Sequence, residues 1–173
     1  MEIFKPKMYC KSIFDIHYQK LKKMGIHCLI FDLDNTLGFI DYPNCSRECK
    51  ELIETLKKDF LVLICSNNLR GRVRPYMREL GVDGVCFSLK PFRFGLFRIM
   101  RRYQLKREEM CLIGDQVLTD ILAGNRFNIQ TILVDPLSEK DLKITGINRK
   151  IENVILKNYQ KRGIFERGKY YES

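Results

Sequence analysis

The sequence predicts an α/β fold in which a doubly wound, Rossmann-like parallel sheet is covered by helices on both faces. Five short apolar runs alternate along the chain with segments of helical character. The runs are continuously apolar, as is typical of parallel strands that are buried on both faces. Polar residues follow the ends of these runs, and sheets of this kind bind ligands beyond the carboxyl ends of their strands.

The first helix is expected at residues 8–24, because four apolar residues recur there at roughly helical spacing among lysines. The first strand is the short apolar run at 27–33, which reads HCLIFDL. The next helix is the amphipathic stretch 45–59, for which Ser46 is the expected N-cap. These three elements open the predicted alternation.

The apolar run at 60–68 predicts the second strand, and the helix expected at 72–81 stops at Gly81, a usual C-terminal signal. The remaining elements follow the same alternation. Strands are expected at 84–91, 110–116 and 130–137, and helices at 92–105 and 119–128. From about Ser138 onward the chain reads as a polar helical tail.

The composition predicts one globular domain over residues 1–173, with a core at about 26–137 and a basic tail at 149–173. The chain is 45% hydrophobic and carries a net charge of +10, which favours anionic partners. Its seven cysteines are scattered, so a reducing cytosol is expected. Cys45 and Cys49 lack a second pair or nearby histidines, which disfavours zinc and leaves their role open.

The polar residues at the strand ends carry the functional prediction. Asp32 and Asp34 follow the first strand, Ser66 the second, Lys90 the third and Asp115 the fourth. Because the carboxyl ends of parallel strands share one edge of the sheet, these side chains are expected to converge. Four strand ends that converge on acids, a hydroxyl and a lysine indicate a catalytic site.

Three carboxylates in one place need a cation, and Mg²⁺ accepts carboxylate oxygens while it bridges to a phosphate. Asp32 and Asp34 stand at positions i and i+2, so both can face one phosphorus atom. One carboxylate can attack it and the other can act as acid and base. Lys90 and Ser66 would then neutralise the phosphoryl oxygens.

These residues resemble the four motifs of the haloacid dehalogenase (HAD) phosphatases. DLDNT matches the DxDxT motif, and ICSNN, SLKP and GDQVLTD match the next three in order. The resemblance implies that Asp32 is the nucleophile and Asp34 the general acid and base. It implies phosphate ligands at Ser66, Asn67 and Lys90.

The resemblance also implies that the metal is held by Asp32, Asp115 and the backbone carbonyl of Asp34. The supporting residues that it implies are Thr36, Gly114 and Asp120.

The match extends over roughly residues 3–152 to the YqeG-type branch, HAD subfamily IIIA. That branch is similar in its early proline, its isoleucine-rich helix, its DNTL motif and the later stretch TGINRKIE. Members of the branch resemble phosphatidylglycerophosphate phosphatases, so the resemblance implies phosphatidylglycerol as the product. Gly38 departs from the pattern, because a larger apolar residue is expected after DNTL.

Neither gap between the motifs holds a cap domain, so an open site is expected, suited to a phosphate on something large. Between Arg70 and Arg107, eleven basic residues stand against two acidic ones. Such a surface suits an anionic leaflet. The expected partner is therefore an anionic phospholipid at a membrane surface. No apolar run reaches the ~20 residues of a spanning helix, so the protein is expected in the cytoplasm, peripheral on the inner face of the membrane.

Other functions stay open at this point. The same chemistry would serve a phosphatase for a phosphoprotein or a nucleic-acid end. A signalling receiver domain also gathers aspartates at strand ends, but it would keep its phospho-aspartate and would not hydrolyse a substrate catalytically. An RNA- or ribosome-associated protein with a vestigial site is a further alternative, since aromatic residues of the tail could stack on bases. The intact Asp32, Asp34, Lys90 and Asp115 argue against this last alternative.

Overall fold

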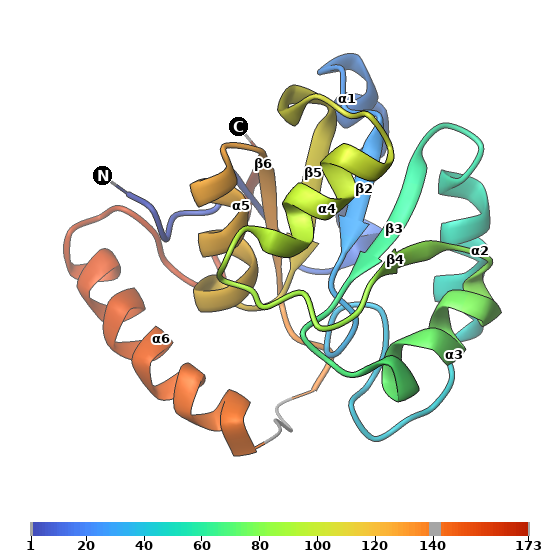
Figure 1. Ribbon diagram of the computed structural model, residues 1–173. Coiled ribbons are helices and arrows are strands. Elements are labelled where there is room, and N and C mark those ends of the chain that lie inside the picture. The colour runs from blue at the N-terminus through green and yellow to red at the C-terminus, as the bar shows by residue number, and fades with distance from the viewer. Residues whose placement is uncertain (1, 139–142, 173) are drawn as a thin grey trace.

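The computed structural model describes residues 2–138 and 143–172, with the side chains of 143–149 left out. Its described strands form one sheet in the order β4-β3-β2-β5-β6-β1-β7 (Figure 1). The strands are Met8–Cys10 (β1), Cys28–Phe31 (β2), Leu61–Cys65 (β3), Asp83–Val85 (β4), Met110–Gly114 (β5), Gln130–Val134 (β6) and Tyr171–Glu172 (β7). Neighbours pair in parallel except β1 and β7, which are antiparallel.

The helices cover both faces of this sheet, which confirms the predicted doubly wound fold (Figure 1). They are Tyr18–Lys23 (α1), Arg47–Leu56 (α2), Arg70–Leu80 (α3), Phe94–Arg102 (α4), Leu122–Phe127 (α5) and Lys143–Lys161 (α6). Short helical turns occupy Ile13–Asp15, Arg107–Glu109 and Val117–Ile121. The caps predicted at Ser46 and Gly81 are both present.

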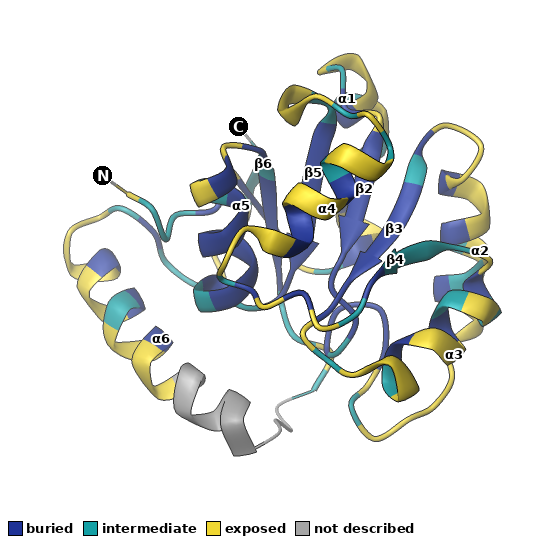
Figure 2. Cartoon of the chain, in the orientation of Figure 1, coloured by how far each residue is buried: buried dark blue, intermediate teal, exposed yellow. Residues whose placement is uncertain are grey.

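The core forms on both sides of the central strands because successive side chains of β2 point to opposite faces. Leu29 and Phe31 pack with α1, α2 and α3, whereas Cys28 and Ile30 pack with α4 and α5. The burial colours of Figure 2 show these strands enclosed between helices. A third cluster lies beneath α6 and includes Tyr9 of β1.

The connections place a topological switch point between β2 and β5. The chain runs outward from β2 through β3 to β4, and then returns to β5 and continues to β6 on the other side. Ligands of doubly wound sheets bind beyond the carboxyl ends of the strands at such a point. Residues 32–38 and 115–121 leave β2 and β5 there, so the sheet brings the first and fourth motifs together.

The helix predicted at 8–24 is wrong in its first half. Residues 8–10 form β1, which pairs with β6 in the register Met8 to Ile132, and only α1 is helical beyond the short turn. Met8, Tyr9 and Cys10 are all buried. The four apolar residues whose spacing predicted the helix all follow residue 10, so that spacing carried no information about residues 8–10. Later apolar residues of the segment, including Leu21, pack into the core.

The strand predicted at 84–91 ends early, at Val85. Phe87 and Leu89 have φ values of 51° and 59°, which no strand accommodates. This geometry leaves Phe87 and Leu89 exposed and directs the buried Ser88 and Lys90 into the protein. The segment is therefore a loop, and its conformation places the Lys90 side chain in the interior.

The polar tail is also more ordered than predicted where it is described. Tyr159 and Phe165 are buried against Tyr9, and Tyr171 belongs to β7. These three rings pack within the fold, whereas Tyr170 of the same tail is 46% exposed. The stretch TGINRKIE lies partly outside the residues whose side chains are described.

Candidate active site

Lys90 and two aspartates form a buried ion triad at the switch point. The Lys90 ammonium lies 2.7 Å from Asp32 Oδ1 and 2.6 Å from Asp120 Oδ1. Only 2% of the Lys90 side chain is exposed, and Asp120 is fully enclosed. The triad joins the first, third and fourth motifs, which lie far apart in the sequence, in one site.

The pKa values of the triad follow from burial and from these short contacts. Burial raises the pKa of Asp32 to about 7, with Lys90 opposing the rise and Asp120 adding to it. For Lys90, burial disfavours the charged form, but Asp120 and Asp32 outweigh it and raise the pKa of the ammonium. Lys90 is therefore a fixed positive charge beside the predicted nucleophile.

Asp115 completes an acidic cluster that fits a divalent cation. One carboxylate oxygen from each of Asp32, Asp115 and Asp120 lies within 4.8 Å of the others. Thr36 donates a hydrogen bond of 3.3 Å to Asp115 Oδ1, which orients that carboxylate. Three buried carboxylates exceed the single charge of Lys90, and hard oxygen donors are what Mg²⁺ and similar ions prefer.

Gly114 is required by the close approach of Asp120. A Cβ atom at Gly114 would lie 2.7 Å from the Asp120 Cβ and still nearer to its carboxyl group. The backbone N–H of Gln116 donates to Asp120 Oδ2 at 3.1 Å and fixes the carboxylate from the other side. Gly114 thus leaves room for the Asp120 carboxylate that Lys90 contacts, and the Gln116 N–H holds that carboxylate in place.

The Asp34 side chain lies outside the acidic cluster. Arg72 of α3 donates to Asp34 Oδ1 through Nε at 3.0 Å and through Nη2 at 2.8 Å. The Asn68 amide donates to the other carboxylate oxygen. Arg72 and Asn68 therefore hold the Asp34 carboxylate apart from the three carboxylates of the cluster.

Sequence reasoning missed Arg72 and Asn68 as members of the site. Asn68 belongs to the quoted ICSNN stretch, but Arg72 lies in a helix rich in arginines, where nothing distinguishes it from its neighbours. Arg72 also donates to the carbonyl oxygens of Phe39 and Tyr42. It thereby ties the loop after β2 to Asp34.

Ser66 and Asn67 follow β3 and hold the loop that carries Lys90. The Ser66 carbonyl accepts from the Ser88 N–H at 3.0 Å. Asn67 Oδ1 accepts from the Lys90 N–H at 2.7 Å and from Ser88 Oγ at 2.8 Å, while its Nδ2 donates to the Lys90 carbonyl at 2.8 Å. The Asn67 side chain thus holds the backbone of the loop that carries Lys90.

The loop after DNTL explains the unexpected Gly38. A Cβ atom there would lie 2.6 Å from Cε1 of Tyr76, a fully buried ring of α3. Tyr76 fills the space that a larger residue would occupy, and its hydroxyl donates to the carbonyls of Tyr42 and Asn44. Residues 37–65 hold only this loop, α2 and β3, and residues 67–89 hold α3, β4 and connecting turns, so neither range contains a cap domain.

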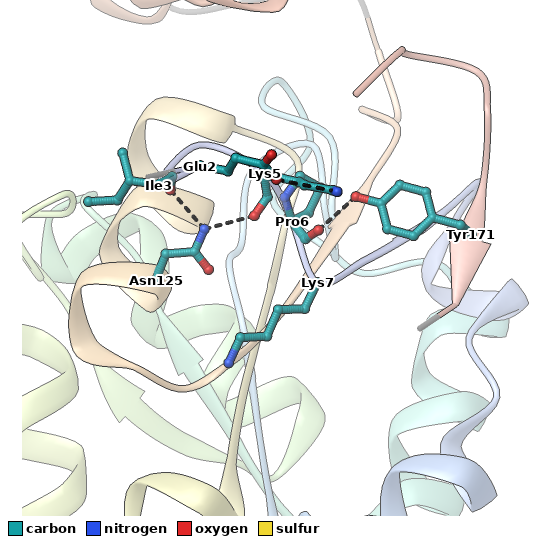
Figure 3. A pocket seen from close by; sticks show the side chains of 7 residues that line it. All are labelled: Glu2, Ile3, Lys5, Pro6, Lys7, Asn125 and Tyr171. Carbon is teal, nitrogen blue, oxygen red and sulfur yellow. Dashed lines mark hydrogen bonds and ion pairs between the residues drawn. The ribbon is translucent and has the colours of Figure 1, made fainter. Parts of the chain in front are cut away.

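The pocket in Figure 3, of about 540 Å³, lies at the opposite end of the sheet. Pro6 and Lys7 line it just before β1 begins, and Asn125 donates to the carbonyls of Ile3 and Lys5. Tyr171 donates to the Pro6 carbonyl and closes the far wall. None of the predicted site residues lines this pocket, which forms where the N-terminal segment crosses α5 and β7.

The seven cysteines are free thiols, and all but Cys86 are buried. Cys45 and Cys49 flank the start of α2, where Cys45 Sγ lies 3.5 Å from the Leu37 carbonyl. They pack in the core on the α2 face. No helix of the described residues is long and apolar enough to cross a membrane.

Comparison with known proteins identifies the class to which this fold and site belong. A family described as HAD-hydrolase-like matches residues 89–143, which include Lys90, Asp115 and Asp120. The 3-deoxy-D-manno-octulosonate 8-phosphate phosphatase of Moraxella catarrhalis, solved with a magnesium ion, phosphate and KDO, aligns with a TM-score of 0.51 at 16% identity. The alignment covers 86% of this chain and 98% of that one, and it shows a shared fold. The chain is a HAD-type hydrolase.

The sequence relatives narrow the class to a family. The probable phosphatase YqeG of Bacillus subtilis (strain 168) is 39% identical over 163 residues, which are 94% of this chain and 95% of that protein. Phosphatidylglycerophosphate phosphatase 1, chloroplastic/mitochondrial, of Arabidopsis thaliana is 24% identical over 92% of this chain. The match spans about half of the plant protein, 49% of its length. This chain belongs to the YqeG family of HAD-type phosphatases.

Proposed function

We propose that the protein is a Mg²⁺-dependent phosphatase that converts phosphatidylglycerophosphate to phosphatidylglycerol through a phosphoaspartate at Asp32. The observation that carries the chemistry is the buried arrangement of Asp32 between Lys90 and two further aspartates. The substrate is supported by similarity to the plant phosphatase over 92% of the chain, and by the absence of a cap domain between the motifs.

In the first step, a carboxylate oxygen of Asp32 attacks the phosphorus and the bond from phosphorus to the glycerol oxygen breaks. Protonated Asp34 gives its proton to the departing alkoxide and is left as a carboxylate. Asp34 has to turn from Arg72 and Asn68 to reach that oxygen. Lys90 stabilises the negative charge of the transferring phosphoryl group. Such electrostatic stabilisation is strong in a buried site, because water does not screen it.

In the second step, Asp34 takes a proton from water, and the water oxygen attacks the phosphorus of the phosphoaspartate. The acyl–phosphate bond breaks, which frees inorganic phosphate and restores the Asp32 carboxylate. Ser66 and the backbone N–H of Asn67 hold the phosphate oxygens. A Mg²⁺ ion held by Asp32, Asp115 and the Asp34 carbonyl would neutralise the negative charge of the phosphate oxygens. The presence of magnesium in the structure of the Moraxella enzyme supports this choice of metal.

The test is phosphate release from phosphatidylglycerophosphate in mixed micelles, with and without Mg²⁺. We expect Mg²⁺-dependent release that Asp32→Asn abolishes, because an amide is not a nucleophile at phosphorus. Asp59→Asn is the matched control, since Asp59 pairs with Lys22 just before β3 begins, at the far end of the sheet. Hydrolysis of an aryl phosphate without hydrolysis of the lipid would support the proposed mechanism and refute phosphatidylglycerophosphate as the substrate. Phosphoproteins and nucleic-acid ends would then have to be screened as substrates.

A further inference from the structure

The mouth of the site is bordered by apolar side chains that the structure leaves in solvent. We call this set the apolar rim; its members are Phe39, Tyr42, Leu69, Phe87, Leu89 and Phe92. They are between 41% and 70% exposed. All lie on loops that follow the carboxyl ends of β2, β3 or β4, the edge at which Asp32 and Lys90 meet.

Hydrogen bonds connect the rim to the catalytic groups. The Phe87 N–H donates to the Asn68 carbonyl at 2.9 Å, and Asn68 in turn contacts Asp34. Arg72 binds the carbonyls of Phe39 and Tyr42 while it holds Asp34. The rim loops are therefore fixed around the mouth by the same residues that organise the site.

Two rim residues are held outward against the preference of the backbone. Phe87 and Leu89 occupy the left-handed region, which is uncommon for bulky residues. Their alternation with the buried Ser88 and Lys90 means that fixing Lys90 inside the site presents two large apolar side chains outside it. The exposed pair is thus built into the loop that carries a catalytic residue.

A pocket of about 380 Å³ extends the apolar surface along α4. Phe92, Phe94, Phe97 and Phe127 line it together with Arg93 and Arg107. Figure 2 shows exposed residues on the outer side of α4 and in the loop that enters it. Aromatic rings and guanidinium groups alternate on this surface, which combines apolar contact with positive charge.

Further exposed arginines lie on the two helices that follow the rim loops. Arg70 and Arg74 lie on α3, and Arg98 and Arg101 lie on α4. A purely apolar partner would leave these charges without a counterpart, whereas an anionic bilayer offers both apolar depth and negative charge. Each basic residue near such a surface contributes to attraction, and aromatic residues favour the boundary between headgroups and acyl chains.

We infer that the apolar rim docks the protein on an anionic phospholipid bilayer, so that the mouth of the site lies at the level of the headgroups. Exposed apolar patches of this kind mark interaction sites. The inference rests on the proposed function, because a lipid that carries a phosphate monoester would then enter the site without leaving the membrane. An uncapped mouth allows this approach.

The first test is sedimentation with vesicles of phosphatidylcholine, with and without phosphatidylglycerol. We expect the wild type to bind the anionic vesicles and the double variant L69S/F92S to bind them about tenfold more weakly, or ~1.4 kcal/mol. The control is M24S/V154S, which removes comparable apolar groups, 45% and 70% exposed, outside the rim. Thermal unfolding checks the fold of each variant.

A second measurement uses the fact that the chain contains no tryptophan. Phe92→Trp places a single reporter in the rim, and Met24→Trp places one near the amino end of β2. Brominated phosphatidylcholine in the anionic vesicles should quench the first reporter and leave the second unchanged. Equal quenching of both, or of neither, would overturn the inference.

Other results would also decide the matter. Equal binding by wild type and L69S/F92S, or no binding by the wild type, would refute docking through the rim and would point to a macromolecular partner instead. If the protein hydrolyses phosphatidylglycerophosphate in micelles but does not bind vesicles, the docking inference fails and the proposed function stands. If it binds vesicles through the rim but does not hydrolyse that lipid, docking stands and the proposed substrate fails.

Discussion

The buried ion triad allows a quantitative test of what Lys90 contributes to the fold. In the variant Lys90→Met the apolar stem is kept and the ammonium is lost. Asp32 and Asp120, which lie 2.7 and 2.6 Å from that ammonium, then face each other without it. Removal of one partner from a buried ion pair costs ~3–5 kcal/mol. For a chain of this length the melting temperature falls by ~2–4 °C per kcal/mol.

We therefore expect Lys90→Met to lower the melting temperature by roughly 6–20 °C, following these two estimates. Thermal unfolding is followed by circular dichroism in the presence of EDTA. The EDTA removes any bound metal that could compensate for the missing positive charge. The matched control is Lys50→Met. Lys50 makes an ion pair of similar length with Glu79, 2.6 Å, but 42% of its side chain is exposed. Exposed pairs contribute little, so the control should melt within ~2 °C of the wild type.

Equal melting shifts for the two variants would refute the reasoning, because burial would then not distinguish the two ion pairs. The double variant Lys90→Met with Asp120→Asn gives an independent check. It removes the charge of one of the two carboxylates that Lys90 contacts, so it should regain part of the lost stability. If the second substitution brings no gain, carboxylate repulsion is not the cause of the loss.

Three further predictions concern the chemistry and its supports. Asp34→Asn should slow hydrolysis of an alkyl phosphate far more than that of an aryl phosphate, whose leaving group needs no proton; equal slowing would contradict the acid role. Gly114→Ala should displace Asp120, lower kcat at least ~tenfold and cost ~1–3 kcal/mol of stability by overpacking. Gly71→Ala, where nothing lies within 4 Å, should leave both unchanged or raise stability. Asn67→Ala should lower kcat about tenfold, which corresponds to the free energy of one or two ordinary hydrogen bonds to the loop that carries Lys90. An unchanged kcat with an aryl phosphate would show that the loop keeps its conformation without the Asn67 side chain.

The sequence predicted those elements whose signals are local. Continuous apolar runs gave β2, β3, β5 and β6, and Ser46 and Gly81 marked helix ends by their own chemistry. The convergence of Asp32, Lys90 and Asp115 followed from one topological rule about parallel strands. For the strands and the helix ends the information lay within a few residues, and for the site one general rule about parallel sheets supplied the rest.

The failures arose where distant residues decide the conformation. Residues 8–10 become a strand because β6 and β7 lie on either side of them, and the residues they pair with are 124 or more positions away in the chain. The loop at 86–91 is shaped by Asn67, whose amide holds Lys90. Arg72 could not be singled out because its partner, Asp34, is 38 positions away and nothing in the helix marks it.

The pairing of β1 with β7 has a consequence for the order of folding. β1 is synthesised well before β7, and in the described structure its outer edge pairs with Tyr171 and Glu172. Until those residues emerge, the backbone groups of residues 8 and 9 on that side are open to another chain, as on any unprotected edge strand. Cleavage just before residue 170 should thus favour self-association while it leaves every catalytic residue in place.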